Sequence, residues 1–182
     1  MLEVPEHLLE ERRRLGHDRR DEMWEGVLHM VPQPLSRNQR LGALLVSALL
    51  PPADARGLWV AYGTNLFRPG TGWNDYRVPD LVVARPEHVS ERGVEGRAEL
   101  VIEIRSPGDE SYEKVPFYAD VGCQEVLIVD RDTLELALFV RGEPRPSGLP
   151  MELESLGVEI ERIDGPALVV IWEQARTEIR PR

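Results

Sequence analysis

The sequence has little lysine and little cysteine. Of its 22 basic residues, 21 are arginine and one is lysine, Lys114. Arginine stays protonated and forks onto carboxylates and phosphates, whereas lysine is a compact charge whose pKa can be moved, so this lysine is a candidate for chemistry. The single cysteine, Cys123, cannot form a disulfide within the chain, which agrees with a reducing compartment. No local signature around Cys123 indicates a catalytic thiol.

Long apolar runs are also absent. No stretch approaches the ~20 apolar residues that a membrane-spanning helix needs. The N-terminal residues 1–20 are highly charged and lack the apolar centre of a signal peptide. We therefore expect a cytoplasmic protein without a membrane contact.

Several enzyme signatures are missing from the chain. There is no phosphate-binding loop, no dinucleotide-binding glycine motif and no G-x-S-x-G elbow. The histidines are scattered and are not spaced like zinc ligands; they are His7, His17, His29 and His88. These absences disfavour a nucleotide-driven enzyme, a serine hydrolase and a zinc hydrolase.

The chain is acidic, with a net charge of −10. A protein with this net charge is not expected to attract nucleic acid by its overall charge. A local basic surface, or a carboxylate site that works with a bound metal, stays possible. Arginines cluster at residues 12–14 and 19–20, but acidic residues flank them. This mixture predicts a solvated helix face.

The order of predicted elements indicates a mixed α/β domain with helices packed on a central sheet. The 182 residues, 42% of them hydrophobic, favour a single domain over 1–182, with a core at about 20–140 and a strand-rich extension at about 150–175. Helices are predicted over 5–16, over 36–50 and near 109–121. Ser36 is predicted to cap the second helix, and Pro51 and Pro52 are predicted to end it. A loop is predicted over 142–150. Strands are predicted over 22–31 as a pair around Gly26, 58–67, 77–84, 98–105, 125–130, 133–140, 158–162 and 166–172.

Two acidic residues interrupt segments that are otherwise typical of apolar strands. Asp80 lies in VPDLVVA and Glu103 lies in LVIEIR. Charged side chains are rarely buried unless they are paired or bound to an ion. Alternate strand residues share a face, which places Asp80 with Val82 and Glu103 with Val101. If the two strands are neighbours, their carboxylates converge on a hard-oxygen site suited to Mg²⁺ or Mn²⁺.

A purely structural interpretation of these acids remains open. Glu103 can pair with Arg105 or Arg77 instead of a metal, and Asp80 can cap a local turn.

Lys114 falls on the apolar stripe of the helix predicted near 109–121. On a helix it shares a face with Phe117, Tyr118 and Val121. Its ammonium group therefore either passes the ring of Tyr118 toward solvent or points toward an inward acid such as Glu103.

Proline at position 116 limits where this helix begins. Proline is tolerated in the first turn of a helix and disrupts the interior, and it disfavours helical conformation in the residue before it. A helix that starts near Val115 leaves Lys114 just before it and weakens the shared-face argument.

These features resemble the PD-(D/E)XK nuclease superfamily and, more narrowly, the Uma2 family of restriction-endonuclease-like proteins. The matching segments lie in order between about residues 20 and 140, and they are EMWEG, YRVPDLVVA, LVIEIRSP followed by Lys114, YADVG and QEVLIVD. The resemblance implies a restriction-endonuclease-like fold, in which helices flank a central mixed β-sheet. It also implies metal-dependent hydrolysis of phosphodiester bonds in DNA.

The resemblance implies roles for particular residues. Asp80 and Glu103 would hold Mg²⁺ or Mn²⁺ together with the backbone carbonyl of Ile104, and Lys114 would position or deprotonate the attacking water. Further candidates for this site are Glu22, as an additional acid, and Glu25, Arg105 and Tyr118.

Three positions depart from the family pattern. Arg105 occupies the slot where the superfamily often has lysine, Asn38 stands where family members often have histidine, and Val27 replaces an acid after the hairpin glycine. These departures keep a second interpretation open, in which the chain is an inactive nuclease fold that serves as a binding or dimerisation module. The nuclease interpretation predicts DNA as substrate and a homodimer, because cutting both strands benefits from two sites.

Overall fold

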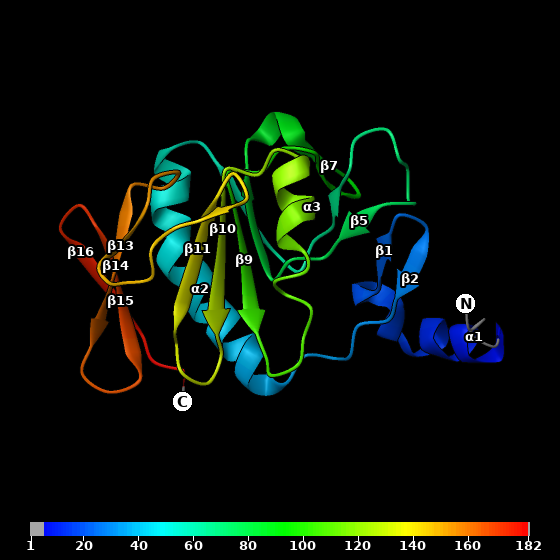
Figure 1. Ribbon diagram of the computed structural model, residues 1–182, viewed down its shortest axis with the longest axis horizontal. Coiled ribbons are helices and arrows are strands. Elements are labelled where there is room, and N and C mark those ends of the chain that lie inside the picture. The colour runs from blue at the N-terminus through cyan, green and yellow to red at the C-terminus, as the bar shows by residue number, and fades with distance from the viewer. Residues whose placement is uncertain (1–5, 182) are drawn as a thin grey trace.

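The computed structural model describes residues 6–181, and its strands form three sheets (Figure 1). The central sheet has the order β12-β11-β10-β9-β6-β3. β9 and β10 run parallel, whereas the other neighbours in this sheet are antiparallel. The bounds are Trp59–Tyr62 for β3, Leu81–Ala84 for β6, Leu100–Arg105 for β9, Glu125–Asp130 for β10, Leu136–Val140 for β11 and Glu143–Pro144 for β12. The predicted mixed sheet is confirmed.

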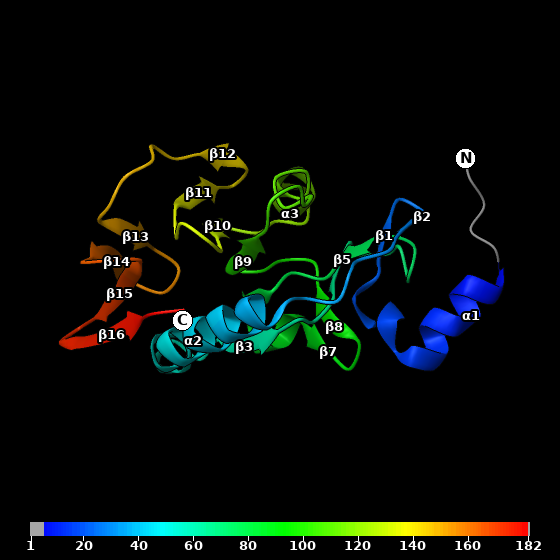
Figure 2. The same ribbon diagram turned by 90° about the horizontal axis from the view of Figure 1, so that it is seen from below.

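Two helices cover opposite faces of the central sheet (Figure 2). They are α2 (Ser36–Ala55) and α3 (Val115–Asp120). Alternate residues of β9 pack on opposite sides, so that Ile102 lies in the α2-side core and Val101 in the core that contains Tyr118 of α3. The predicted faces of β9 are confirmed, and β9 pairs with β6, which meets the condition for the two carboxylates to converge. Glu103 therefore lies on the α3 side of the sheet.

A second, smaller sheet holds the N-terminal hairpin beside the central sheet (Figure 1). Its order is β2-β1-β5-β4-β8-β7. The bounds are Glu22–Trp24 for β1, Val27–His29 for β2, Leu66–Phe67 for β4, Tyr76–Arg77 for β5, Val89–Ser90 for β7 and Gly93–Glu95 for β8. The short helices α1 (Glu6–Leu15) and η1 (His17–Arg20) precede it, and η2 (Pro86–His88) leads into β7. Pro5, predicted to open the first helix, lies outside the described residues.

Two predicted strands are each divided between the two sheets. Residues 58–67 form β3 and β4, and residues 77–84 form β5 and β6, so the interpretation of Asp80 as a mid-strand residue is wrong. Pro79 has no N–H to donate to a sheet ladder, which favours a break at this point. The Gly63 N–H donates to the Asp80 carbonyl at 2.8 Å and continues the β3–β6 pairing as far as Asp80. Asp80 therefore lies where the chain passes from one sheet to the other.

Helix α2 continues through Pro51 and Pro52 to Ala55, so the prediction that these prolines end it is wrong. A proline inside a helix removes one backbone hydrogen bond. Packing compensates, because Pro52 and Ala53 of this last turn are buried.

The starts of α2 and α3 differ from those predicted, because Ser36 does not cap α2 and α3 begins later than expected. Ser36 is the first residue of α2, and Leu35 occupies the N-cap position without a side-chain cap. The helix predicted near 109–121 begins only at Val115, so Pro116 lies in its first turn and Lys114 takes the N-cap position. Turns occupy most of the segment between β9 and Lys114.

The C-terminal segment forms a four-stranded antiparallel sheet. Part of the loop predicted over 142–150 forms β12, which pairs with β11, and the C-terminal sheet begins after this loop. The strands are β13 (Met151–Leu153), β14 (Val158–Ile163), β15 (Ala167–Trp172) and β16 (Ala175–Ile179). Their buried side chains share one hydrophobic core with α2 and β9. On this shared core we propose that the chain forms one domain.

Candidate functional site

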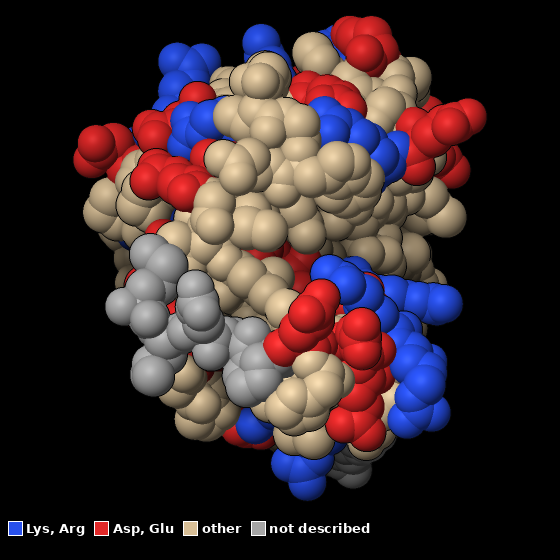
Figure 3. All heavy atoms as spheres, turned by 90° about the vertical axis from the view of Figure 1, so that its right-hand side faces the viewer, with Lys and Arg blue, Asp and Glu red and all other residues tan. Residues whose placement is uncertain are grey.

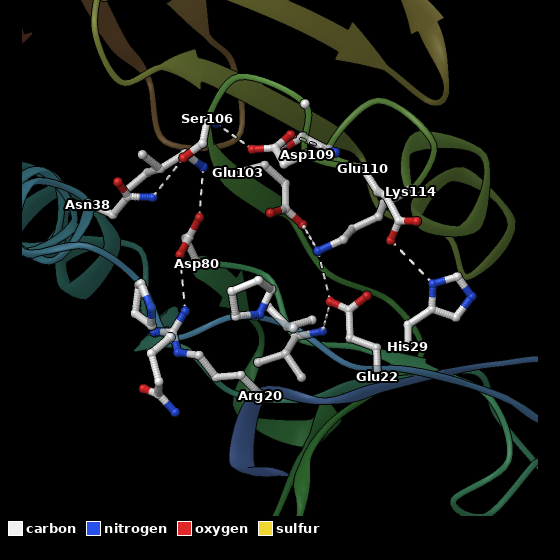
Figure 4. Close-up of a pocket in the computed structure, with 18 of the residues that line it drawn as sticks. Arg20, Glu22, His29, Asn38, Asp80, Glu103, Ser106, Asp109, Glu110 and Lys114 are labelled. Carbon is white, nitrogen blue, oxygen red and sulfur yellow. Dashed lines mark hydrogen bonds and ion pairs between the residues drawn. The ribbon is translucent and has the colours of Figure 1, made fainter. Parts of the chain in front are cut away.

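A cleft of about 950 Å³ opens between the central sheet, the N-terminal hairpin and the start of α2. On the molecular face that carries α1, red and blue side chains are interspersed, and a recessed red area lies near the middle (Figure 3). Asp80, Glu103 and Lys114 all line the cleft, together with Glu22 and Arg20 (Figure 4). The structure thus brings together residues from η1, β1, the β5–β6 junction, β9 and the N-cap of α3.

Asp80 is buried at the edge of β9. Its Oδ2 accepts a hydrogen bond of 2.8 Å from the Ile104 backbone N–H, and its Oδ1 accepts one of 3.4 Å from Arg20 Nη1. Burial raises the pKa of Asp80, although the Ile104 N–H and the Arg20 charge oppose that rise. The hydrogen bond at Oδ2 therefore fixes the orientation of the side chain, and Oδ1 faces the cleft.

The N–H and C=O of one strand residue point to the same side of the strand. Since the Ile104 N–H points toward Asp80, its carbonyl lies on that side as well. This placement agrees with the predicted use of the Ile104 carbonyl beside the Asp80 carboxylate.

Glu103 is a second buried acid of the cleft. Burial raises its pKa to about 8, the Lys114 charge opposes that rise, and the charges of Asp80 and Glu22 add to it. The Tyr118 hydroxyl donates a hydrogen bond to Glu103 Oε1. Tyr118 thus holds this carboxylate from the α3 side.

Lys114 joins two carboxylates that belong to different sheets. Its Nζ lies 2.8 Å from Glu22 Oε1 and 3.3 Å from Glu103 Oε1. Burial disfavours the charge of Lys114, but Glu103 and Glu22 outweigh it and hold its pKa above the ordinary value. Of the two interpretations, the ammonium group that points toward inward acids is the one observed.

Glu22 is held in place by hydrogen bonds to both of its oxygens. Oε1 also accepts from the Val78 N–H at 2.9 Å, and Oε2 accepts from Trp24 Nε1 at 2.8 Å. Its residue surface is only 1% exposed, so it is a third buried carboxylate beside Lys114.

Two further candidate residues lie elsewhere. Glu25 is exposed at the tip of the β1–β2 hairpin, and Arg105 Nη1 pairs with Asp130 Oδ2 at 3.0 Å. Neither residue lines the cleft. Arg105 pairs with Asp130 and Arg77 pairs with Asp75, so neither arginine is the ion-pair partner of Glu103.

Sequence reasoning missed several cleft residues. Arg20 belongs to the arginine cluster interpreted as a solvated face, and that interpretation is wrong for Arg20 because it is mostly buried against Asp80. On the opposite wall, Arg131 Nη1 donates to Ser106 Oγ at 3.0 Å and to Asn38 Oδ1 at 3.3 Å. No local sequence pattern identifies these contacts, because their partners are far apart in the chain.

The donor set of the cleft fits a hard divalent cation. Among residues 6–181, no three His, Cys, Asp or Glu side chains gather closely enough to enclose a metal by themselves. Mg²⁺, however, is usually held by one or two carboxylates and completes its coordination with waters and substrate phosphates. Asp80, Glu103 and the Ile104 carbonyl supply oxygen donors of that kind.

Comparisons with known proteins agree with the fold. A family model described as "Uma2: Putative restriction endonuclease" matches residues 6–164. A crystal structure described as "a putative nuclease belonging to DUF820", from Anabaena variabilis, is similar with a TM-score of 0.56 and 18% identity, over 66% of this chain and 72% of that chain. No curated protein matches. None of the helices in the described part of the chain has the length and apolar character needed to cross a bilayer.

Proposed function

Since the chain belongs to the Uma2 family and has a nuclease-like fold, we propose that it is a Mg²⁺- or Mn²⁺-dependent endonuclease that hydrolyses phosphodiester bonds in DNA. The observation that supports this most directly is the position of Lys114 between Glu22 and Glu103 in the cleft that also holds Asp80. We also propose that the protein is cytoplasmic, that DNA is its substrate and that it is a homodimer, because cutting both strands benefits from two sites.

In this proposal Asp80, Glu103 and the Ile104 carbonyl hold the cation. A bound divalent cation would neutralise charge on the phosphate and lower the pKa of a coordinated water. Tyr118 orients Glu103 through its hydroxyl, and the Ile104 N–H orients Asp80. These hydrogen bonds fix both carboxylates before the cation binds, which reduces the reorganisation that binding requires.

Lys114 positions the attacking water in this proposal. Its pKa is held above the ordinary value by Glu103 and Glu22, so it is an ammonium ion that donates hydrogen bonds. Glu22 keeps that ammonium in the cleft from the hairpin side.

Plasmid cleavage by the purified protein with Mg²⁺ or Mn²⁺ tests this function. We expect Glu103→Gln and Lys114→Ala each to lower the cleavage rate at least about 100-fold, because each removes a group that touches the reacting atoms. Glu25→Gln is the matched control, since this acid is exposed at the hairpin tip and its loss should leave the rate unchanged.

Two outcomes would reject the nuclease assignment. Cleavage that persists in both site variants would point to a contaminating enzyme. An absence of any carboxylate-dependent Mn²⁺ binding in calorimetry would instead favour the inactive module that binds a partner or dimerises.

A further inference from the structure

Arg20 lies beside Asp80 and has no task in the function proposed above. It ends η1, lines the cleft, and has a side chain that is 18% exposed. Its guanidinium lies over the ring of Tyr62, with 5.5 Å between Cζ and the ring centroid. Arg20 thus lies in a cleft that also holds the carboxylates of Asp80, Glu22 and Glu103 (Figure 4).

The guanidinium of Arg20 has unused donors. An arginine offers five N–H groups. Arg20 donates one long hydrogen bond of 3.4 Å to Asp80, and the Tyr62 hydroxyl is a second polar neighbour. By comparison, Nη1 of Arg77 alone donates to three oxygens at 2.9–3.1 Å. Arg20 is therefore placed next to an acid without being saturated by it.

Asp80 does not depend on Arg20 for its orientation. The Ile104 N–H already fixes Oδ2 at 2.8 Å, whereas Arg20 touches only Oδ1. Oδ1 is the oxygen that remains for a cation in the cleft. A divalent ion and Arg20 would compete for the same oxygen.

The charges of the cleft give Arg20 a second partner. Among the buried groups of the cleft, Glu22, Asp80 and Glu103, when ionised, exceed Lys114 and Arg20 by one negative charge. The exposed Asp109 and Glu110 and the half-buried Arg131 also line the cleft. At the buried centre a divalent cation reverses the excess of one, and one phosphodiester group then neutralises it. Arginine matches phosphate oxygens in both charge and fork geometry.

We propose that Arg20 is a phosphate-binding residue, held at Oδ1 of Asp80 in the metal-free protein and transferred to a phosphate oxygen of bound DNA. This inference rests on the proposed nuclease function. Arg20 leaves Oδ1 when that oxygen takes the divalent ion, and Tyr62 keeps the guanidinium in the cleft.

Binding of a duplex DNA oligonucleotide in Ca²⁺, which holds the complex without turnover, gives the first test. We expect Arg20→Gln to weaken DNA binding about tenfold and to reduce the slope of log affinity against log salt by about one. Arg19→Gln is the matched control, because it removes the same charge from the adjacent, exposed position. An effect of Arg20→Gln on DNA affinity and salt slope no larger than that of Arg19→Gln would overturn the proposal.

Calorimetry of Mn²⁺ binding without DNA gives the second test. Because Arg20 competes with the cation, Arg20→Gln should bind Mn²⁺ several-fold more tightly than the wild type. Arg20→Lys should keep an affinity near that of the wild type. Weaker Mn²⁺ binding in Arg20→Gln would show a merely structural role and overturn the inference. Wild-type protein that binds neither Mn²⁺ nor DNA would overturn the proposed function as well, so the two failures are distinguishable.

Discussion

A single lysine is buried at the centre of the site because two acids meet it there. Removing a charged group from water costs several kcal/mol unless partners compensate. Lys114 has Glu22 on one side and Glu103 on the other, and it belongs to the loop that leads into α3. At the scale of residues, the burial of each of these three groups depends on the other two.

Burial makes the nucleophilic sulfur of Cys123 unreactive. Burial raises the pKa of its thiol to about 12, and its Sγ donates to the Glu125 carbonyl at 3.0 Å. The thiolate is the reactive form, so at mildly alkaline pH the folded protein has almost none. We expect no reaction with Ellman's reagent in the native state and one thiol per chain in concentrated guanidinium chloride. Rapid labelling of the native protein would contradict this prediction.

The residues that sequence reasoning found are those with a local anomaly. Asp80 and Glu103 stand out as acids in apolar segments, and Lys114 stands out as the only lysine. Arg20 has no such mark, because its role depends on Asp80, 60 positions away, and the pairing of Glu22 with Lys114 spans 92 positions. Long-range partners of this kind follow from the way the sheets pack and not from any local pattern.

At the scale of elements, the N-terminal hairpin is fixed to the helix that follows Lys114. The guanidinium of Arg77 lies between two rings, with its Cζ 4.3 Å from the centroid of Trp24 and 4.0 Å from that of Phe117. Its Nη1 also donates to the Met23 carbonyl. Since β1 contributes Glu22 and α3 follows Lys114, this stacking sets the separation of the two charged groups.

Helix α2 contains a glycine that the adjacent strand requires. A Cβ added to Gly42 would lie 2.2 Å from a ring carbon of Tyr62 in β3. Gly→Ala within a helix normally stabilises a protein by about 1 kcal/mol. Here the clash reverses the sign, and we expect Gly42→Ala to destabilise the protein by about 1–3 kcal/mol and to disturb the Tyr62–Arg20 stack.

Urea unfolding of Gly42→Ala measures this effect. The control is Gly42→Ala combined with Tyr62→Leu, which removes the ring and should restore part of the lost stability. A single variant more stable than the wild type would show that Tyr62 moves aside without cost.

Element boundaries were harder to predict than element types, for a reason visible in α2 and at Pro79. Proline rules predict an end at Pro51, yet the helix continues because burial of Pro52 and Ala53 outweighs the lost hydrogen bond. At Pro79 the apolar run suggests one strand, yet the chain changes sheet there. In both places, tertiary packing overrides the local preference.

At the scale of the whole molecule, the C-terminal sheet lies on the far side of α2 from the site (Figure 2). Its residues Leu153, Val158 and Ile179 are fully or almost fully buried in the core that also contains Leu45 of α2. The sheet therefore supports the helix whose first turn places Asn38 in the lining of the cleft. If the chain is one domain, as proposed, loosening this sheet must destabilise the rest of the molecule as well.

Glu125 provides the means to test this coupling. It begins β10 of the central sheet, and its buried carboxylate accepts hydrogen bonds from the Glu154 N–H at 2.9 Å, the Ser155 N–H at 3.0 Å and the Ser155 hydroxyl. Glu125→Ala leaves these donors without their acceptor, and we expect a loss of about 3 kcal/mol in the free energy of unfolding. Exposed Glu152→Ala is the matched control and should change it by no more than about 0.5 kcal/mol.

The form of the unfolding transition distinguishes one domain from two. In a single cooperative unit, circular dichroism and tryptophan fluorescence report the same midpoint, and Glu125→Ala shifts both midpoints equally. A C-terminal sheet that folds separately would instead give two transitions in the variant, with the lower one belonging to the sheet that contains Trp172. That result would reject the single-domain proposal while leaving the site in the central sheet untouched, because residues before Pro150 contribute every side chain that lines the cleft.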